Sequence, residues 1–275
     1  MSVVQAPDLH VLSDDILERL AAGAAATPSG DRADEIQALH ELGYLLLAVP
    51  VELGGLGGNL VQVCHQQRQL ARRAPAVALA VNEHLCWTGT AAELRRCGNL
   101  SLVWLLEEAA GGEVFSGGIG ERESLSPLAW AQTTLASITT GIADRAFALG
   151  VTGARRAGAP PGIPDLGRRR VAALMAVELE GLVAHADRVT DDWSAGVAHG
   201  SAWPAKLAAA RSRVAAGAER IIAAALDLWA GANGAAVDEL ERLRSHLGDA
   251  GLAIDDTFDD VIGRWAVDEA LGVRG

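Results

Sequence analysis

The chain contains 275 residues, half of them apolar and only 4% aromatic, and it carries a formal net charge of -12. A surface for nucleic-acid phosphates needs clustered Lys and Arg, so this acidic composition argues against a nucleic-acid partner. A chain of this length can bury a core large enough to be stable without metals or disulfides. Because alanines are abundant and β-branched or aromatic runs are scarce, the composition favours packed helices over sheet.

The cysteines and the N-terminal residues predict a cytoplasmic protein. Cys64, Cys86 and Cys97 lack CxxC spacing, and one would stay unpaired if the other two were bridged, so a reducing compartment is the simpler interpretation. The N-terminal residues lack a basic region followed by an apolar run, which is the mark of a secretory signal. No stretch is apolar over the length that a bilayer requires, and we expect no membrane segment.

Helix signals follow one another through the first half of the chain. Ser13 can cap a first helix, and the two aspartates after it place carboxylates at the positive end of the helix dipole. A second helix is expected from Ser29 to Gly43, and Pro75 separates a third helix from a fourth. The third, fourth and fifth helices are expected at 60–73, 76–96 and about 100–110. The stretch 111–124 has no sustained period and is the part of the chain most similar to a strand.

Apolar residues repeat at helical spacing in the second half. From Pro127 to Arg156 they recur every seven positions, which predicts one long bundle helix. A turn rich in Pro and Gly is expected at 158–167, followed by a helix with an apolar stripe and by another that begins at Pro204. The residues predicted to face the core on these three helices are Leu128, Leu135, Ile138, Ile142 and Leu149; Met175, Leu179, Leu182, Ala186 and Val189; and Leu207, Val214, Ile221 and Leu228.

Small residues accompany the last of these stripes. Ala210, Gly217 and Ala224 each follow a stripe residue by three positions and would let a neighbouring helix approach closely. Glycines at 229–234 then interrupt the pattern. Two shorter helices are expected at 236–247 and 256–271.

The sequence therefore predicts an all-α protein with two domains. An N-terminal helical domain is expected at 1–124 and a C-terminal four-helix-bundle-like domain at 125–275. The seven tryptophans, Trp104, Trp203 and Trp229 among them, are predicted to anchor the core and interfaces.

The order of several segments resembles that of the flavin-dependent acyl-CoA dehydrogenase family. AVPVELGGLGG resembles the entry into the family's second helical pair, and ARRAPAVALAVNEHLCWTG resembles the helix beside its acyl pocket. WLLEEAAGGEVFSGG is similar to the helix and strand that lead into its β-domain. LASITTGIADRAFALGVTGARRAG and the stretch from DDWSAG to WAGANG resemble its C-terminal bundle. The resemblance covers about residues 12 to 271.

The resemblance also implies a loss, because nothing fills the interval between Ser124 and Pro127 in which the family carries its β-domain. In the family the flavin ring lies between the β-domain and the bundle. The resemblance therefore implies that FAD is possible as a cofactor, with binding weakened or lost because the β-domain is absent.

The resemblance assigns cofactor-binding roles to residues in three parts of the sequence. Ser116 stands in the turn where the family enters its β-domain. Bundle arginines reach the flavin phosphate in the family, and a Gly-rich turn approaches the flavin from a neighbouring subunit. The corresponding residues here are Arg155, Arg156, Gly231, Asn233 and Gly234. Glycines allow backbone N–H groups to point at an anion, although a helix end needs the same glycines.

Asp255 and Asp256 are the candidates for the family's catalytic base, a carboxylate that removes a proton while the flavin takes hydride. Paired aspartates ahead of a helix also serve as caps and dipole partners. Together with Asp259 and Asp260 they form a run that could chelate Mg²⁺ on a diphosphate, as in all-α isoprenoid synthases, although such sites need several convergent ligands.

The substrate-binding candidates are Asn82, His84 and Trp87, on the helix that corresponds to the border of the acyl pocket. The substrate implied by the resemblance is an acyl thioester, free or carrier-bound. Three hypotheses follow: a flavin-dependent acyl-thioester enzyme, acting alone or with a partner subunit; a non-redox enzyme that reuses the acyl-binding cleft; or a non-catalytic helical scaffold. A homodimer or higher oligomer is expected, because loss of the β-domain would expose apolar surface.

Overall fold

The computed structural model describes residues 11–26, 32–116, 125–155, 165–231 and 234–249. These residues form helices, turns and coil and contain no strand, which confirms the all-α prediction. Of the stretch 111–124, expected to be the most strand-like, the described residues 111–116 are turn and coil. None of the described helices combines the length and the apolarity needed to traverse a lipid bilayer.

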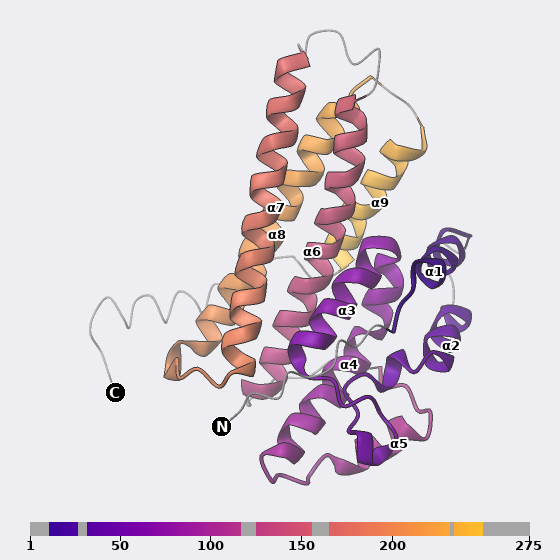
Figure 1. Ribbon diagram of the computed structural model, residues 1–275, viewed down its shortest axis with the longest axis vertical. Helices are drawn as coiled ribbons and strands as arrows, with labels where there is room; N and C mark the ends of the chain where they lie inside the picture. Colours follow the sequence, from indigo (N-terminus) through magenta and orange to yellow (C-terminus); the bar gives the residue numbers. More distant parts are fainter. Residues whose placement is uncertain (1–10, 27–31, 117–124, 156–164, 232–233, 250–275) are drawn as a thin grey trace.

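The described residues of the N-terminal half form a cluster of five α-helices and two short 3-10 helices (Figure 1). The α-helices are α1 (Asp14–Ala26), α2 (Ala33–Glu41), α3 (Leu60–Arg73), α4 (Pro75–Arg96) and α5 (Val103–Ala110), and the 3-10 helices are η1 (Tyr44–Leu46) and η2 (Val51–Leu53). Gly43, at φ 72°, lets the chain turn after α2, because this left-handed conformation is strained for other residues. Asn59 begins α3 with a capping box, in which its side chain and that of Gln62 each accept the other's backbone N–H.

The C-terminal half is a bundle of long helices (Figure 1). Its helices are α6 (Leu125–Arg155), α7 (Asp165–Ser194), the 3-10 helix η3 (Gly200–Ala202), α8 (Trp203–Leu228) and α9 (Ala235–Asp249). The turn predicted at 158–167 was wrong at its end, since residues 165–167 belong to α7. A carboxylate in the first turn, supplied by Asp165, favours a helix start there.

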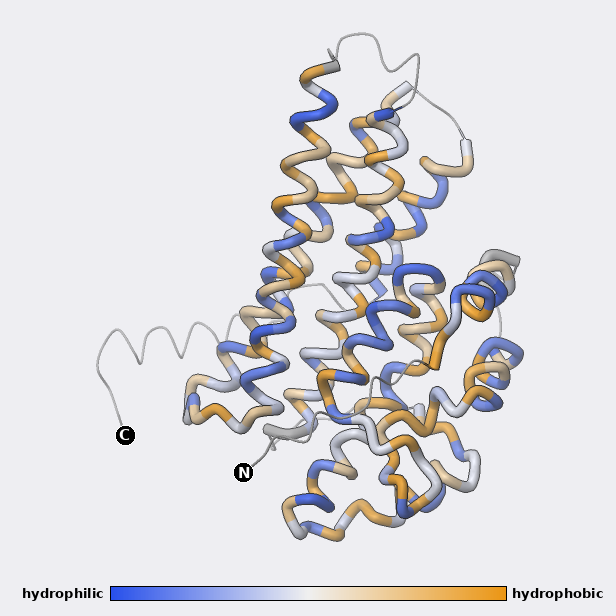
Figure 2. The backbone as a smooth tube through the Cα atoms, viewed as in Figure 1, coloured by the Kyte–Doolittle hydropathy of each residue, from blue (hydrophilic) through white to orange (hydrophobic). Residues whose placement is uncertain are grey.

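The predicted core stripes of α7 and α8 are confirmed. All five residues predicted on α7 and all four on α8 are buried. The small residues on α8 also act as expected, because a Cβ added at Gly217 would lie 2.4 Å from Leu182 Cδ2. Figure 2 shows hydrophilic and hydrophobic residues alternating along these helices, as expected for helices with one buried face.

α6 follows its predicted stripe only in part. Ile138 and Ile142 are fully buried, whereas Leu128, Leu135 and Leu149 are only partly buried. The reason is that α6 packs against α3 and α4 as well as α7, α8 and α9, so several of its sides are covered (Figure 1). Small and hydroxyl residues fill those sides, including Thr133, Thr134, Ser137, Thr139 and Thr140.

Two glycines permit the close contact between α6 and the N-terminal helices. A Cβ at Gly141 of α6 would lie 2.4 Å from the backbone oxygen of Arg68 on α3. A Cβ at Gly89 of α4 would lie 2.2 Å from the indole of Trp130 on α6. Helix α6 therefore joins the two halves at their closest points.

Candidate cofactor and substrate site

His84 lies inside the protein with both ring nitrogens engaged. It is 1% exposed, and Nε2 lies 2.9 Å from the carbonyl oxygen of Leu45. The backbone N–H of Phe115 donates to Nδ1 at 3.2 Å. Since Nδ1 accepts, the ring proton of the neutral imidazole must be on Nε2, where it donates to Leu45. The Phe115 ring stacks on His84 with centroids 5.8 Å apart.

The protein favours the neutral form of His84. Burial lowers the pKa of the imidazole, the hydrogen bond to Leu45 opposes this shift, and the nearby His40 adds to the lowering. A neutral ring with a fixed tautomer is suited to holding two backbone groups in place.

Asn82 belongs to a buried chain of polar side chains. The Tyr44 hydroxyl donates to Gln67 Oε1 at 2.9 Å, and Gln67 Nε2 donates to Asn82 Oδ1 at 3.1 Å. Gln67 Nε2 also lies 3.3 Å from the carbonyl oxygen of Ala78. Burial raises the pKa of the Tyr44 hydroxyl well above its usual value, so the hydroxyl stays protonated as a donor. This chain ties η1, α3 and α4 together.

Trp87, the third substrate-binding candidate, lies apart from this polar chain. It is partly buried and packs against a small apolar cluster that includes Leu105 and Leu106 of α5. Asn82 and His84 therefore have partners within the fold, and Trp87 contacts a different set of neighbours. A role in lining a substrate pocket stays a prediction for all three.

The described cofactor candidates of the bundle lie together at one end of it. Arg155 is the exposed last residue of α6, and Gly231 and Gly234 lie between α8 and α9 with φ values of 75° and 142°. The two parts are joined by Trp229, whose Nε1 donates to the Leu149 carbonyl at 2.9 Å. The structure thus groups residues that the sequence places about 80 positions apart.

Ser116 lies far from that group. It is exposed and follows Phe115, which contacts His84 on α4. That part of α4 lies beside Thr134 of α6, since Cys86 Sγ is 3.3 Å from Thr134 Oγ1. Thr134 precedes Arg155 by about 30 Å along α6, at about 1.5 Å per residue. Within one chain the candidates therefore form two separate groups.

The remaining candidates lie outside the described residues. They are Arg156, Asn233, Asp255 and Asp256, together with the rest of the aspartate run at 255–260. Among the side chains that the structure describes, no three His, Cys, Asp or Glu residues converge as metal ligands.

A polar and aromatic cluster escaped the sequence predictions. Glu93 Oε2 accepts two indole N–H groups, from Trp130 at 2.8 Å and from Trp193 at 3.2 Å. Glu93 lies on α4, and Trp130 on α6 and Trp193 on α7 are 37 and 100 positions away from it in sequence. No local sequence pattern therefore predicts this cluster. Trp193 also packs edge-on against Trp203 at 5.0 Å. Trp203 is buried, as predicted for a core tryptophan, whereas Trp104 is 55% exposed.

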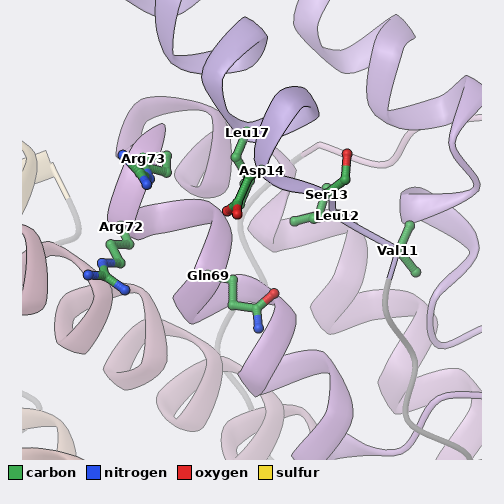
Figure 3. Close-up of a pocket in the computed structure, with 8 residues that line it drawn as sticks. All are labelled: Val11, Leu12, Ser13, Asp14, Leu17, Gln69, Arg72 and Arg73. Carbon is green, nitrogen blue, oxygen red and sulfur yellow. The ribbon is translucent and has the colours of Figure 1, made fainter.

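A pocket of about 490 Å³ lies where the start of α1 meets the end of α3. Figure 3 shows Arg72 and Arg73 at one end of it and Val11 at the other. Asp14 also lines it, and Arg72 Nε is paired with Asp144 Oδ2 at 3.0 Å. The pocket combines charges of both signs with apolar side chains, and none of the predicted site residues lines it.

Comparison with known proteins gives a family match for the first part of the chain. Residues 14–99 match the model of the acyl-CoA dehydrogenase N-terminal domain. No curated protein matches the chain in sequence.

Solved structures share the fold at low identity. KijD3 in complex with dTDP is 17% identical with a TM-score of 0.74, over 94% of each chain. KijD3 in complex with FMN and dTDP-3-amino-2,3,6-trideoxy-4-keto-3-methyl-D-glucose is 17% identical with a TM-score of 0.75, over 95% of this chain and 92% of that one. The dibenzothiophene monooxygenase TdsC from Paenibacillus sp. A11-2 is 13% identical with a TM-score of 0.48, over 90% of each chain. Residues 14–99 are thus similar to the N-terminal domain of the acyl-CoA dehydrogenases, and the chain shares its helical fold with KijD3.

Proposed function

We propose that this protein is a flavin-dependent oxidoreductase of the acyl-CoA dehydrogenase type, acting in the cytoplasm on an acyl thioester. The observation that carries the proposal is the match of residues 14–99 to the family's N-terminal domain, within a fold shared along the chain with an FMN-binding protein. FMN is as good a candidate as FAD, because it is the flavin in KijD3.

The described residues fit a flavin only if two copies of the chain contribute to one site. Ser116 and the group formed by Arg155, Gly231 and Gly234 are separated along α6 by a distance that exceeds one flavin nucleotide. An antiparallel pair of chains brings the Ser116 end of one copy toward the Arg155 end of the other. Such a pair is the commonest form of soluble oligomer.

The outer face of α7 supports a second copy. Leu166, Leu174 and Val177 are 79%, 60% and 72% exposed and lie 8 and 3 residues apart on one side of the helix. Large exposed apolar side chains in a row are typical of interaction surfaces. These residues lie in the first half of α7, and a contact that continues along the whole helix in antiparallel direction would place opposite ends of the two chains side by side (Figure 1).

In this site each group of residues has a distinct task. The Ser116 hydroxyl donates a hydrogen bond, the Arg155 guanidinium neutralises a phosphate, and the turn at Gly231 and Gly234 presents backbone N–H groups to it. Asp255 or Asp256 removes the proton beside the thioester carbonyl. Bound flavin supplies the hydride acceptor.

The direct test is flavin binding by the purified protein. We expect the visible absorption of a bound flavin, either as purified or after incubation with excess FMN or FAD followed by removal of the free compound. Protein that stays colourless with both flavins would rule the proposal out.

Pairs of variants test whether the site is shared. Ser116→Asp and Arg155→Glu should each abolish flavin binding, because a new carboxylate would face the phosphate. Co-expressed at equal amounts, the two variants should recover about a quarter of the wild-type capacity, since half of the pairs are mixed and one of their two sites is intact. Arg19→Glu on α1 makes the same charge change as Arg155→Glu, away from both groups, and this variant should bind flavin normally. If the mixture recovered no flavin binding, Ser116 and Arg155 would not belong to one site shared between two copies.

A non-catalytic scaffold is the second candidate. The observation in its favour is that Asn82 and His84, expected at a substrate pocket, already have partners within the fold. A protein that forms dimers but binds neither flavin would support it.

A further inference from the structure

The segment after α5 has few attachments to the rest of the protein. Gly111, Gly112 and Glu113 donate backbone hydrogen bonds back to the end of α5. Gly112, at φ 104°, then turns the chain, and His40 Nε2 lies 3.2 Å from where its Cβ would be. From residue 114 to residue 116, the hydrogen bond that the structure gives is from Phe115 N–H to His84 Nδ1.

His84 holds this segment from two directions. Its ring joins the carbonyl of Leu45 in η1 to the N–H of Phe115, and these groups are 39 and 31 residues away from it in sequence. The Phe115 ring stacks on the imidazole at an interplanar angle of 5°, and it forms a T-shaped contact with Trp104, with ring centroids 6.2 Å apart. One side chain therefore fixes both the backbone and the ring of Phe115.

We propose that His84 is a positioning residue, which fixes the backbone at Phe115 and thereby the place of the Ser116 hydroxyl. The part that concerns Ser116 rests on the proposed function, whereas the hold on Phe115 does not. A neutral imidazole suits this task because it donates at one nitrogen and accepts at the other. His84 thus acts on the site through the backbone, and the segment 113–116 is the element that it controls.

Protonation of His84 removes this hold. An imidazolium has donors at both nitrogens, so Nδ1 can no longer accept from Phe115. Among the titratable groups of the described residues, His40 on α2 acts on the ring; Tyr44 precedes Leu45 in sequence, and the exposed Glu113 lies in the segment itself. His40 favours the neutral ring, and Tyr44 stays uncharged at these pH values.

The sign of the pH effect follows from the lowered pKa of His84. The stabilisation by the neutral ring is complete above the pKa of an unfolded histidine, about 6.5. It is lost as the pH falls below that value and through the lower pKa of the folded protein. Segment 113–116 should therefore loosen only at a pH below the ordinary pKa of histidine, where the His84 ring of the folded protein becomes protonated.

Hydrogen exchange measured by mass spectrometry tests the proposal on the whole protein without any ligand. In His84→Leu, the protection factor of the Phe115 amide within segment 113–116 should fall by about tenfold, the factor expected for loss of one hydrogen bond. Amides of α8 should keep theirs. His84→Gln, which retains a donor and an acceptor, should restore part of the protection. Unchanged protection at 113–116, or an equal fall in α8, would overturn the proposal.

The wild-type protein supplies a test that needs no variant. In a pH titration followed by NMR, the Phe115 amide resonance should shift with the same midpoint as the His84 ring, at a pH below 6.5. A Phe115 amide that does not follow the ring would contradict the proposal even if the variants failed to fold.

Flavin affinity separates this inference from the proposed function. If the wild type binds flavin, His84→Leu should bind it more weakly and His84→Gln should lie between the two; equal affinities would remove the link to Ser116. If the wild type binds no flavin, the proposed function fails, while exchange and NMR still decide whether His84 holds Phe115.

Discussion

Replacing Gly141 by alanine is expected to destabilise the protein by about 3 kcal/mol, even though alanine is the better helix former. The added Cβ would lie 2.4 Å from the Arg68 carbonyl oxygen and 3.1 Å from the Arg72 nitrogen. Both are backbone atoms of α3, which cannot rotate away as a side chain could. The helices α3 and α6 would have to separate. Urea denaturation followed by circular dichroism measures the free energy of unfolding.

Gly181→Ala is the matched control. Gly181 also lies within a long helix, α7, but nothing comes within 4 Å of its added Cβ. This variant should therefore show only the propensity effect and gain about 1 kcal/mol. If both variants were stabilised, the close crossing of α3 and α6 would be wrong.

Truncation of Trp130 to alanine should lower the free energy of unfolding by about 4 kcal/mol, within the range for buried aromatic residues. Trp130 is 1% exposed, fills the space above Gly89 and donates to Glu93. The variant would leave a cavity between α4 and α6 and remove one of the two indole donors of Glu93. Trp130→Phe should lose less, because most of the packing remains.

Trp104→Ala provides the comparison for Trp130. Trp104 is 55% exposed, and its indole forms a T-shaped contact with the Phe115 ring. Its truncation should cost about 1 kcal/mol or less. Far-ultraviolet circular dichroism is the suitable signal, since tryptophan fluorescence changes with the substitutions themselves. Similar losses for Trp104 and Trp130 would contradict the assigned packing.

The sequence was most informative where a helix has one buried side. On α7 and α8 the apolar spacing identified the buried residues, and Gly217 marked a close helix contact. On α6 the same reasoning succeeded at Ile142 but not at Leu135, which is only partly buried. A helix covered on several sides has no single stripe, and its small residues carry as much of the packing as its leucines.

The candidate site was less accessible to this reasoning. The resemblance singled out His84 as a residue of interest, but its partners are backbone atoms of Leu45 and Phe115, and backbone contacts leave no pattern in side-chain types. The Glu93 cluster joins three helices, so its members show no common spacing. The distance between Ser116 and Arg155 depends on how the helices pack, which no single segment determines.

The shared position of α6 bears on how such a protein can be divided. Helix α6 packs against α3 and α4 of the N-terminal half and against α7 and α8 of the C-terminal half. The N-terminal helices therefore have a complete hydrophobic core only when α6 is present. A fragment that stops at residue 124 would uncover Ala71, which lies beside Gly141, and Cys86, which contacts Thr134. Chimeras that exchange only the N-terminal half with that of a relative should therefore fail to fold unless α6 is exchanged as well. Helix α6 should be grafted together with α3 and α4.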